Sequence, residues 1–85
     1  MSENTEWDDL LGIVNVWMCR NTPSVSRLEE IAKNPRVIFL DIAMLVASEF
    51  PEHSDLLVPY KVAWVVKVKA KDRLMLHKLQ GDMPN

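Results

Sequence analysis

The residues of this 85-residue chain that could do acid–base or nucleophilic chemistry are few and far apart. A nucleophile–base pair would need Cys19 beside His53 or His77, and nothing in the sequence brings these residues together. Asp8 and Asp9 are adjacent, so on a helix they point about 100° apart, which is poor geometry for paired acid–base catalysis. The sequence therefore predicts no catalytic residue, and we expect the protein not to be an enzyme.

A metal or cofactor site is not expected either. Zinc would require Glu52, His53 and Asp55 to converge, but their spacing does not match the usual ligand sets, and polar residues after a proline are typical of a solvated loop. The only glycines are Gly12 and Gly81, so no glycine-rich phosphate loop or nucleophile elbow can form. The sequence predicts no metal ion and no cofactor.

Basic residues gather at the C-terminal end of the chain. Residues 1–59 carry a net charge of −6, whereas residues 60–85 carry +4, with Tyr60 and Trp64 among the cations. Aromatic rings between cations can stack on bases while lysines follow phosphates. A solvated lysine face is the favoured interpretation, because the net charge of −2 for the whole chain opposes phosphate binding. The candidate nucleic-acid contacts in this segment are Lys67, Lys69, Lys71, Arg73 and Lys78.

Residues 24–35, SVSRLEEIAKNP, contain a Val-Ser-Arg-Leu-Glu run followed by Asn-Pro. This segment resembles the recognition helix and following turn of repressor-type helix-turn-helix proteins. In that family the early side chains of the recognition helix reach base edges in the major groove, so the resemblance implies DNA contacts by Ser24, Ser26 and Arg27. The same alignment puts Cys19 at the position of the family's turn glycine. An ordinary capped helix is the alternative, and we favour it.

The most apolar segment is residues 35–50, in which 11 of 16 residues are apolar. Asn34 can cap a helix and Pro35 suits its first position, while Pro51 ends the helix because the residue before a proline is pushed out of helical geometry. A helix with so broad an apolar face must be covered on most sides. We therefore expect it at the centre of the domain or of a dimer.

The remaining elements are expected around this helix. Residues 5–21 follow the i, i+3, i+4, i+7 pattern of an amphipathic helix, in which Gly12 indicates a close helix crossing, and residues 22–33 form a short helix. Residues 60–79 alternate like a strand but also fit a helix, which is favoured because no other segment offers a partner strand. As a helix, this segment would have an apolar face made of Trp64, Val65, Val68, Met75, Leu76 and Leu79.

The predicted fold is all-α: a small four-helix orthogonal bundle, or three helices plus one strand. It forms a single domain over residues 1–85, with residues 1–4 and 82–85 as flexible tails. A chain of this length buries only about 60–65% of its unfolded surface, and 48% of its residues are hydrophobic. Both properties favour self-association into a homodimer or a larger oligomer. The absence of a signal sequence and of a long apolar run predicts a cytoplasmic protein.

The favoured function is a small helical interaction module, a dimeric regulator or adaptor of bacterial or viral type that binds another protein. The alternative is a helix-turn-helix-like DNA-binding transcription regulator that uses residues 24–33 or the basic C-terminal segment. A minor alternative is an inhibitor whose acidic surface imitates nucleic acid. Large apolar side chains supply the candidate protein-interface residues, namely Trp7, Trp17, Phe39, Val46, Phe50 and Trp64.

Overall fold

Four prolines separate the helical segments of this chain. Pro23 lies in the loop after the first helix, and Pro35, Pro51 and Pro59 each open a new helical segment. Proline lacks a backbone N–H and its ring fixes φ, so it fits the first turn of a helix and disrupts the interior. The positions of the prolines therefore set the boundaries of the elements locally.

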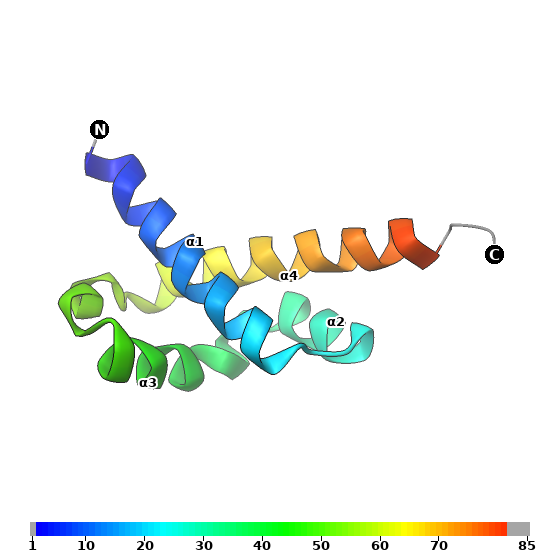
Figure 1. Ribbon diagram of the computed structural model, residues 1–85, viewed down its shortest axis with the longest axis horizontal. Helices are drawn as coiled ribbons and strands as arrows, with labels where there is room; N and C mark the ends of the chain where they lie inside the picture. The colour runs from blue at the N-terminus through cyan, green and yellow to red at the C-terminus, as the bar shows by residue number, and fades with distance from the viewer. Residues whose placement is uncertain (1, 82–85) are drawn as a thin grey trace.

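The computed structural model describes residues 2–81, with the side chains of residues 6–80. Within these residues the chain is all-α, as predicted, and has no strand. Residues 2–4, expected in a flexible tail, are helical, whereas residues 1 and 82–85 lie outside the described range. The elements, of which η1 and η2 are 3-10 helices, are α1 (Ser2–Asn21), α2 (Val25–Lys33), η1 (Pro35–Ile38), α3 (Phe39–Glu49), η2 (Pro51–Leu56) and α4 (Pro59–Gly81) (Figure 1).

Helix α4 is the element around which the others assemble. It contacts α1, α2, α3 and η1, and Figure 1 shows it running along the length of the molecule with α1 crossing it. The strand alternative for residues 60–79 is therefore wrong, and the helical alternative is confirmed. Within the chain, α4 rather than residues 35–50 takes the central place, so the expectation that residues 35–50 lie at the centre of the domain is corrected. Their expected place at the centre of a dimer stays a prediction.

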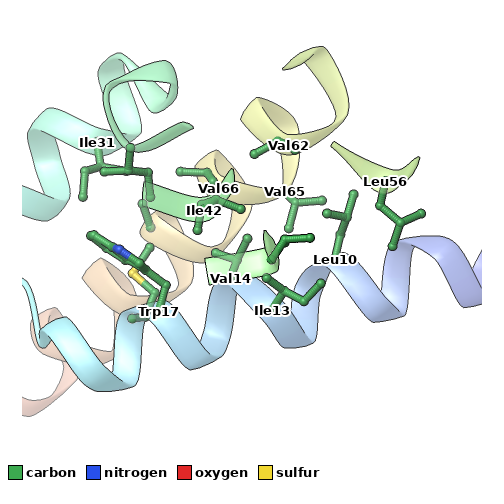
Figure 2. Close-up of a cluster of buried hydrophobic side chains, with 14 of the residues drawn as sticks. Leu10, Ile13, Val14, Trp17, Ile31, Ile42, Leu56, Val62, Val65 and Val66 are labelled. Atoms are coloured by element: carbon green, nitrogen blue, oxygen red, sulfur yellow. The ribbon is translucent and has the colours of Figure 1, made fainter. Parts of the chain in front are cut away.

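A single apolar core joins the helices, and no polar side chain among those described is buried. Figure 2 shows Val14 of α1 pointing toward Ile42 of α3 and Val65 of α4, and Trp17 of α1 pointing toward Ile31 of α2. Small and β-branched residues dominate the α4 contribution, which lets neighbouring helices approach closely. The buried core residues are Leu10, Ile13, Val14, Trp17, Met18, Leu28, Ile31, Ile38, Ile42, Val46, Leu56, Val62, Val65, Val66 and Ala70.

Residues 35–50 are covered on one side only. The segment begins as the 3-10 turn η1 and becomes α-helical at Phe39. Ile42 and Val46 are fully buried, but Leu40 and Met44 are 73% and 70% exposed. The apolar circumference of this helix is therefore divided between the core and an outward face.

The start of α2 is fixed by a serine cap. The Ser24 side chain accepts a hydrogen bond from the Arg27 backbone N–H at 3.2 Å, which satisfies one of the free donors at the helix start. In the preceding loop Thr22 has a positive φ of 39°, a conformation that permits the tight reversal from α1 into α2.

Two features of α1 concern its surface. Gly12 was expected at a close helix crossing, but a Cβ added there would meet no atom within 4 Å, so that expectation is wrong. Near the end of α1, Arg20 Nη2 donates to Glu49 Oε1 of α3 at 2.8 Å. The hydrogen bonds and charge of Arg20 lower the pKa of the Glu49 carboxyl, and Glu49 in turn raises the pKa of Arg20. This exposed pair links the C-terminal ends of α1 and α3.

Candidate interaction surface

Three aromatic side chains form a cluster where the N-terminal halves of α1 and α4 meet. The rings of Trp7 and Trp64 pack edge to face, with centroids 5.4 Å apart and planes at 63°. Together with Tyr60 they line an open hollow of about 420 Å³. Trp64 is 60% and Tyr60 64% exposed, so this aromatic cluster presents apolar rings to solvent.

The scaffold holds the aromatic cluster in place from two sides. Lys61 Nζ lies 3.4 Å from Glu6 Oε1, and this ion pair ties α4 to α1 beside the cluster. Val62 and Val65, on either side of Trp64 along α4, are fully buried in the core. Because the backbone under the cluster is anchored, binding a partner there costs little backbone conformational entropy.

Basic residues continue the same face of α4. At helical periodicity, Lys67 and Lys71 follow Tyr60 and Trp64 by seven residues each, and Lys78 lies a further seven residues on, so all five share one side of the helix. The three lysines are exposed and make no ion pair within residues 6–80. The aromatic cluster is therefore extended by a row of free cations.

The other two basic candidates of α4 face α1. Lys69 and Arg73 are half-buried, and Arg73 Nη2 lies 3.2 Å from both Asn15 Oδ1 and Cys19 Sγ. Arg73 therefore serves the α1–α4 contact, and Lys69 lines the same hollow as Asn15 and Arg73, so the predicted set of five cations divides into two faces. The sequence does not distinguish these two faces, because lysine and arginine occur both on solvated helix faces and at contacts between helices.

The apolar face predicted for α4 also divides. Val65 is buried and Val68 half-buried, whereas the other four side chains are exposed, Trp64 by 60%, Met75 by 63%, Leu76 by 55% and Leu79 by 60%. The buried face of α4 is instead made by Val62, Val65, Val66 and Ala70. The prediction missed this face because α4 carries apolar residues at helical spacing on more than one side, and the spacing does not indicate which side the other helices cover.

The predicted interface residues fall into three groups. Trp7 and Trp64 are brought together in the aromatic cluster. Phe39 and Phe50 are half-buried against the core. Trp17, at 7% exposure, and Val46, at 0%, are core residues, so they cannot touch a partner and this part of the prediction is corrected.

The structure differs from a helix-turn-helix at the turn. Cys19, at the position of the family's turn glycine, lies inside α1, and the loop to α2 follows three residues later at Thr22. Of the implied DNA contacts, Ser26 is exposed, Ser24 is used as the cap, and Arg27 Nη1 pairs with Glu30 Oε1 at 2.7 Å. The resemblance therefore extends to the sequence run but not to the position of the turn.

One surface was not predicted at all. Val37, Leu40, Met44 and Ala47 form an apolar strip on the outward side of η1 and α3, which we call the α3 strip. Their spacing of three, four and three residues is that of the a and d positions of a coiled coil. That spacing is visible in the sequence and could have revealed the strip, had the segment not been treated as apolar all round.

The polar residues considered for metal binding do not converge. His53 Nδ1 lies 3.9 Å from Asp9 Oδ2 and Nε2 lies 3.9 Å from Glu52 Oε2. Among the side chains of residues 6–80, no three of His, Cys, Asp or Glu are arranged to hold a metal ion. None of the helices in that range has the length and hydropathy needed to cross a membrane.

The fold and surface define a small all-α bundle with an exposed aromatic cluster, a lysine row and an apolar strip. Comparison with protein-family models, curated proteins and solved structures gives no match. Function is therefore inferred from the geometry of these surfaces.

Proposed function

We propose that this chain is a non-enzymatic interaction module that binds another protein at the aromatic cluster. The observation that carries the proposal is the exposure of Tyr60 and Trp64 around an apolar hollow, on a backbone anchored by the core. Exposed aromatic rings at a rigid site are typical of residues that dominate protein–protein binding energy. A regulator or adaptor in the cytoplasm is the role that we predict for such a module.

The charge beside the hollow specifies the partner's chemistry. Lys67 and Lys71 stand one to two turns from Trp64 on the same side of α4 and have no ion-pair partner within the described side chains. A matching segment would insert an apolar side chain against the rings and place carboxylates next to these lysines. We therefore propose an acidic amphipathic helix as the bound element.

A protein partner is favoured over nucleic acid at this surface because acidic groups flank the rings. Glu6, which pairs with Lys61, and Asp8 are exposed on either side of Trp7 in α1. Nucleic acid carries a phosphate at every nucleotide, so bases stacked on Trp64 would bring phosphates near these carboxylates, whereas a helix can keep its own carboxylates on the side of Lys67 and Lys71.

The test compares retention of cellular proteins on the immobilised full chain and on variants. Trp64→Ala should weaken binding of the retained partner by about 30-fold or more, the loss typical of a central tryptophan contact. Leu76→Ala is the matched control, because Leu76 is an exposed apolar residue of the same helix outside the aromatic cluster. Lys67→Glu should weaken binding and the control cation change Lys33→Glu should not.

Two results would overturn the proposal. One is a partner held equally by the wild-type chain and by Trp64→Ala. The other is binding of single-stranded oligonucleotides that decreases steeply with salt and is lost in Trp64→Ala, which would assign the surface to nucleic acid instead.

A further inference from the structure

The α3 strip lies away from the aromatic cluster, on the side of α3 opposite the core. Leu40 and Met44 are the two most exposed large apolar side chains of the described chain, at 73% and 70%. Val37, 41% exposed, and Ala47 extend the strip by one turn at each end. An apolar row of this kind on a small protein is stabilised when another apolar surface covers it.

The spacing within the strip indicates a helix as the covering element. Leu40, Met44 and Ala47 of α3 repeat as the d, a and d positions of a two-helix seam, where each side chain inserts between residues of the facing helix. Val37, in the 3-10 turn η1, stands before them at the spacing of an a position. The buried residues Ile38, Ile42 and Val46 lie on the opposite side of the same segment. Pairing through the strip therefore leaves the core unchanged.

The charges that flank the strip favour a second copy of this chain. Arg36 precedes the first a position, Asp41 follows the first d position, and both are exposed and without an ion pair within the described side chains. Asp41 occupies an e position of α3, and Arg36 stands five residues earlier in the 3-10 turn η1. This is the spacing between a g residue and the e′ residue that faces it across a parallel two-helix seam. A two-fold axis along α3 would pair Arg36 with Asp41 of the second copy, and Asp41 with its Arg36.

We infer that the chain forms a symmetric homodimer in which the α3 strips of two copies pair in parallel. The contact is self-complementary, since each copy supplies one cation, one anion and the same apolar row. The η1–α3 segment, Pro35 to Glu49, is only about 25 Å long, so the interface lies at the small end of stable interfaces, about 1,200 Å². We therefore expect a dissociation constant in the micromolar range.

The first test measures the mass of the full chain by sedimentation equilibrium over a concentration series. The wild-type chain should shift from monomer to dimer, and Met44→Glu should weaken this by roughly tenfold or more, because a carboxylate loses its hydration in an apolar seam. Leu76→Glu, a change at a similarly exposed apolar residue of α4, should leave the association unchanged. Circular dichroism confirms that each variant is folded.

The second test reverses the flanking charges. Arg36→Glu or Asp41→Arg alone should weaken the dimer about fivefold, because two exposed pairs are replaced by repulsion. An equimolar mixture of the two variants should associate as tightly as the wild-type chain, since the mixed dimer regains both pairs. This recovery requires Arg36 of one copy to face Asp41 of the other, as the parallel two-fold arrangement places them.

Each remaining outcome overturns the inference. A wild-type chain that stays monomeric up to about 1 mM, even if the strip binds a different protein, excludes the second copy as occupant. A dimer that is unaffected by Met44→Glu uses another surface. A dimer that responds to Met44→Glu but not to the charge reversals, alone or mixed, has a different arrangement of the strips. These tests do not involve the aromatic cluster, so they stand apart from the proposed function.

Discussion

Two isomeric side chains on α3 allow a direct test of which side of this helix faces the core. Ile42 is 0% and Leu40 73% exposed. Replacing either residue with alanine deletes three carbon atoms. The sequence places both residues on one broad apolar face. The structure predicts that the two substitutions have very different effects on the free energy of unfolding.

The magnitude follows from burial. Three buried carbons at about 0.8 kcal/mol each give about 2.4 kcal/mol of lost transfer free energy, and the cavity left in the core raises the cost of Ile42→Ala to about 3–4 kcal/mol. A chain of 85 residues has a total stability of about 4–13 kcal/mol, so this loss is a large fraction. Leu40→Ala removes atoms already in water and should change stability by less than about 0.5 kcal/mol.

The assay is urea unfolding followed by tryptophan fluorescence, with Trp17 as a buried reporter. It is run at a concentration where light scattering shows the wild-type chain to be monomeric, so that pairing of the α3 strip does not contribute. With a slope of about 1 kcal/mol per molar urea, the Ile42→Ala midpoint should fall by about 3 M. Equal losses for the two variants, or a larger loss for Leu40→Ala, would refute the assignment of the buried side.

Two other predictions concern the surface. Gly12→Ala should raise the free energy of unfolding by about 0.5–1 kcal/mol in the same assay, because alanine is the better helix former. Its Cβ would meet open space at this position. A loss of stability would contradict this and show that the added methyl group meets another side chain. Arg20 lowers the pKa of Glu49, so the pair stabilises the fold above the unfolded pKa, about 4.3, and that contribution disappears as the pH falls through the lower folded value. Urea midpoints of unfolding are measured from pH 6 downward, at about 0.1 M salt and below. The midpoint should decrease less steeply with falling pH for Glu49→Gln than for the control Glu29→Gln. Identical pH dependence of the two midpoints would contradict the role of the pair.

Local sequence signals determined much of the fold. Prolines 23, 35, 51 and 59 delimit the elements because a proline restricts the backbone wherever it stands. The apolar periodicity of residues 5–21 predicted a helix in this segment, and α1 is observed there with Leu10 and Val14 in the core. These features depend on residues close together in the chain, so no tertiary contact was needed to recognise them.

The candidate surfaces depended on information that the sequence does not hold. Trp7 and Trp64 were both predicted as contact residues, but their pairing joins positions 57 residues apart in the chain, and only the packing of α1 on α4 brings them together. Trp17, of the same residue type, is buried. Hydrophobicity indicates that a side chain gains by leaving water, without indicating what covers it.

Helix α3 shows the division between the two kinds of information most clearly. Its composition determined that it would be a helix and that most of its circumference would be apolar. Which side faces the core was decided by the tertiary structure: α4 supplies the central position, and Ile42 and Val46 are buried while Leu40 and Met44 remain outside. The physical reason is that one 11-residue helix packed against a small core contacts its neighbours along one side, and the apolar residues on the other side are left for a partner.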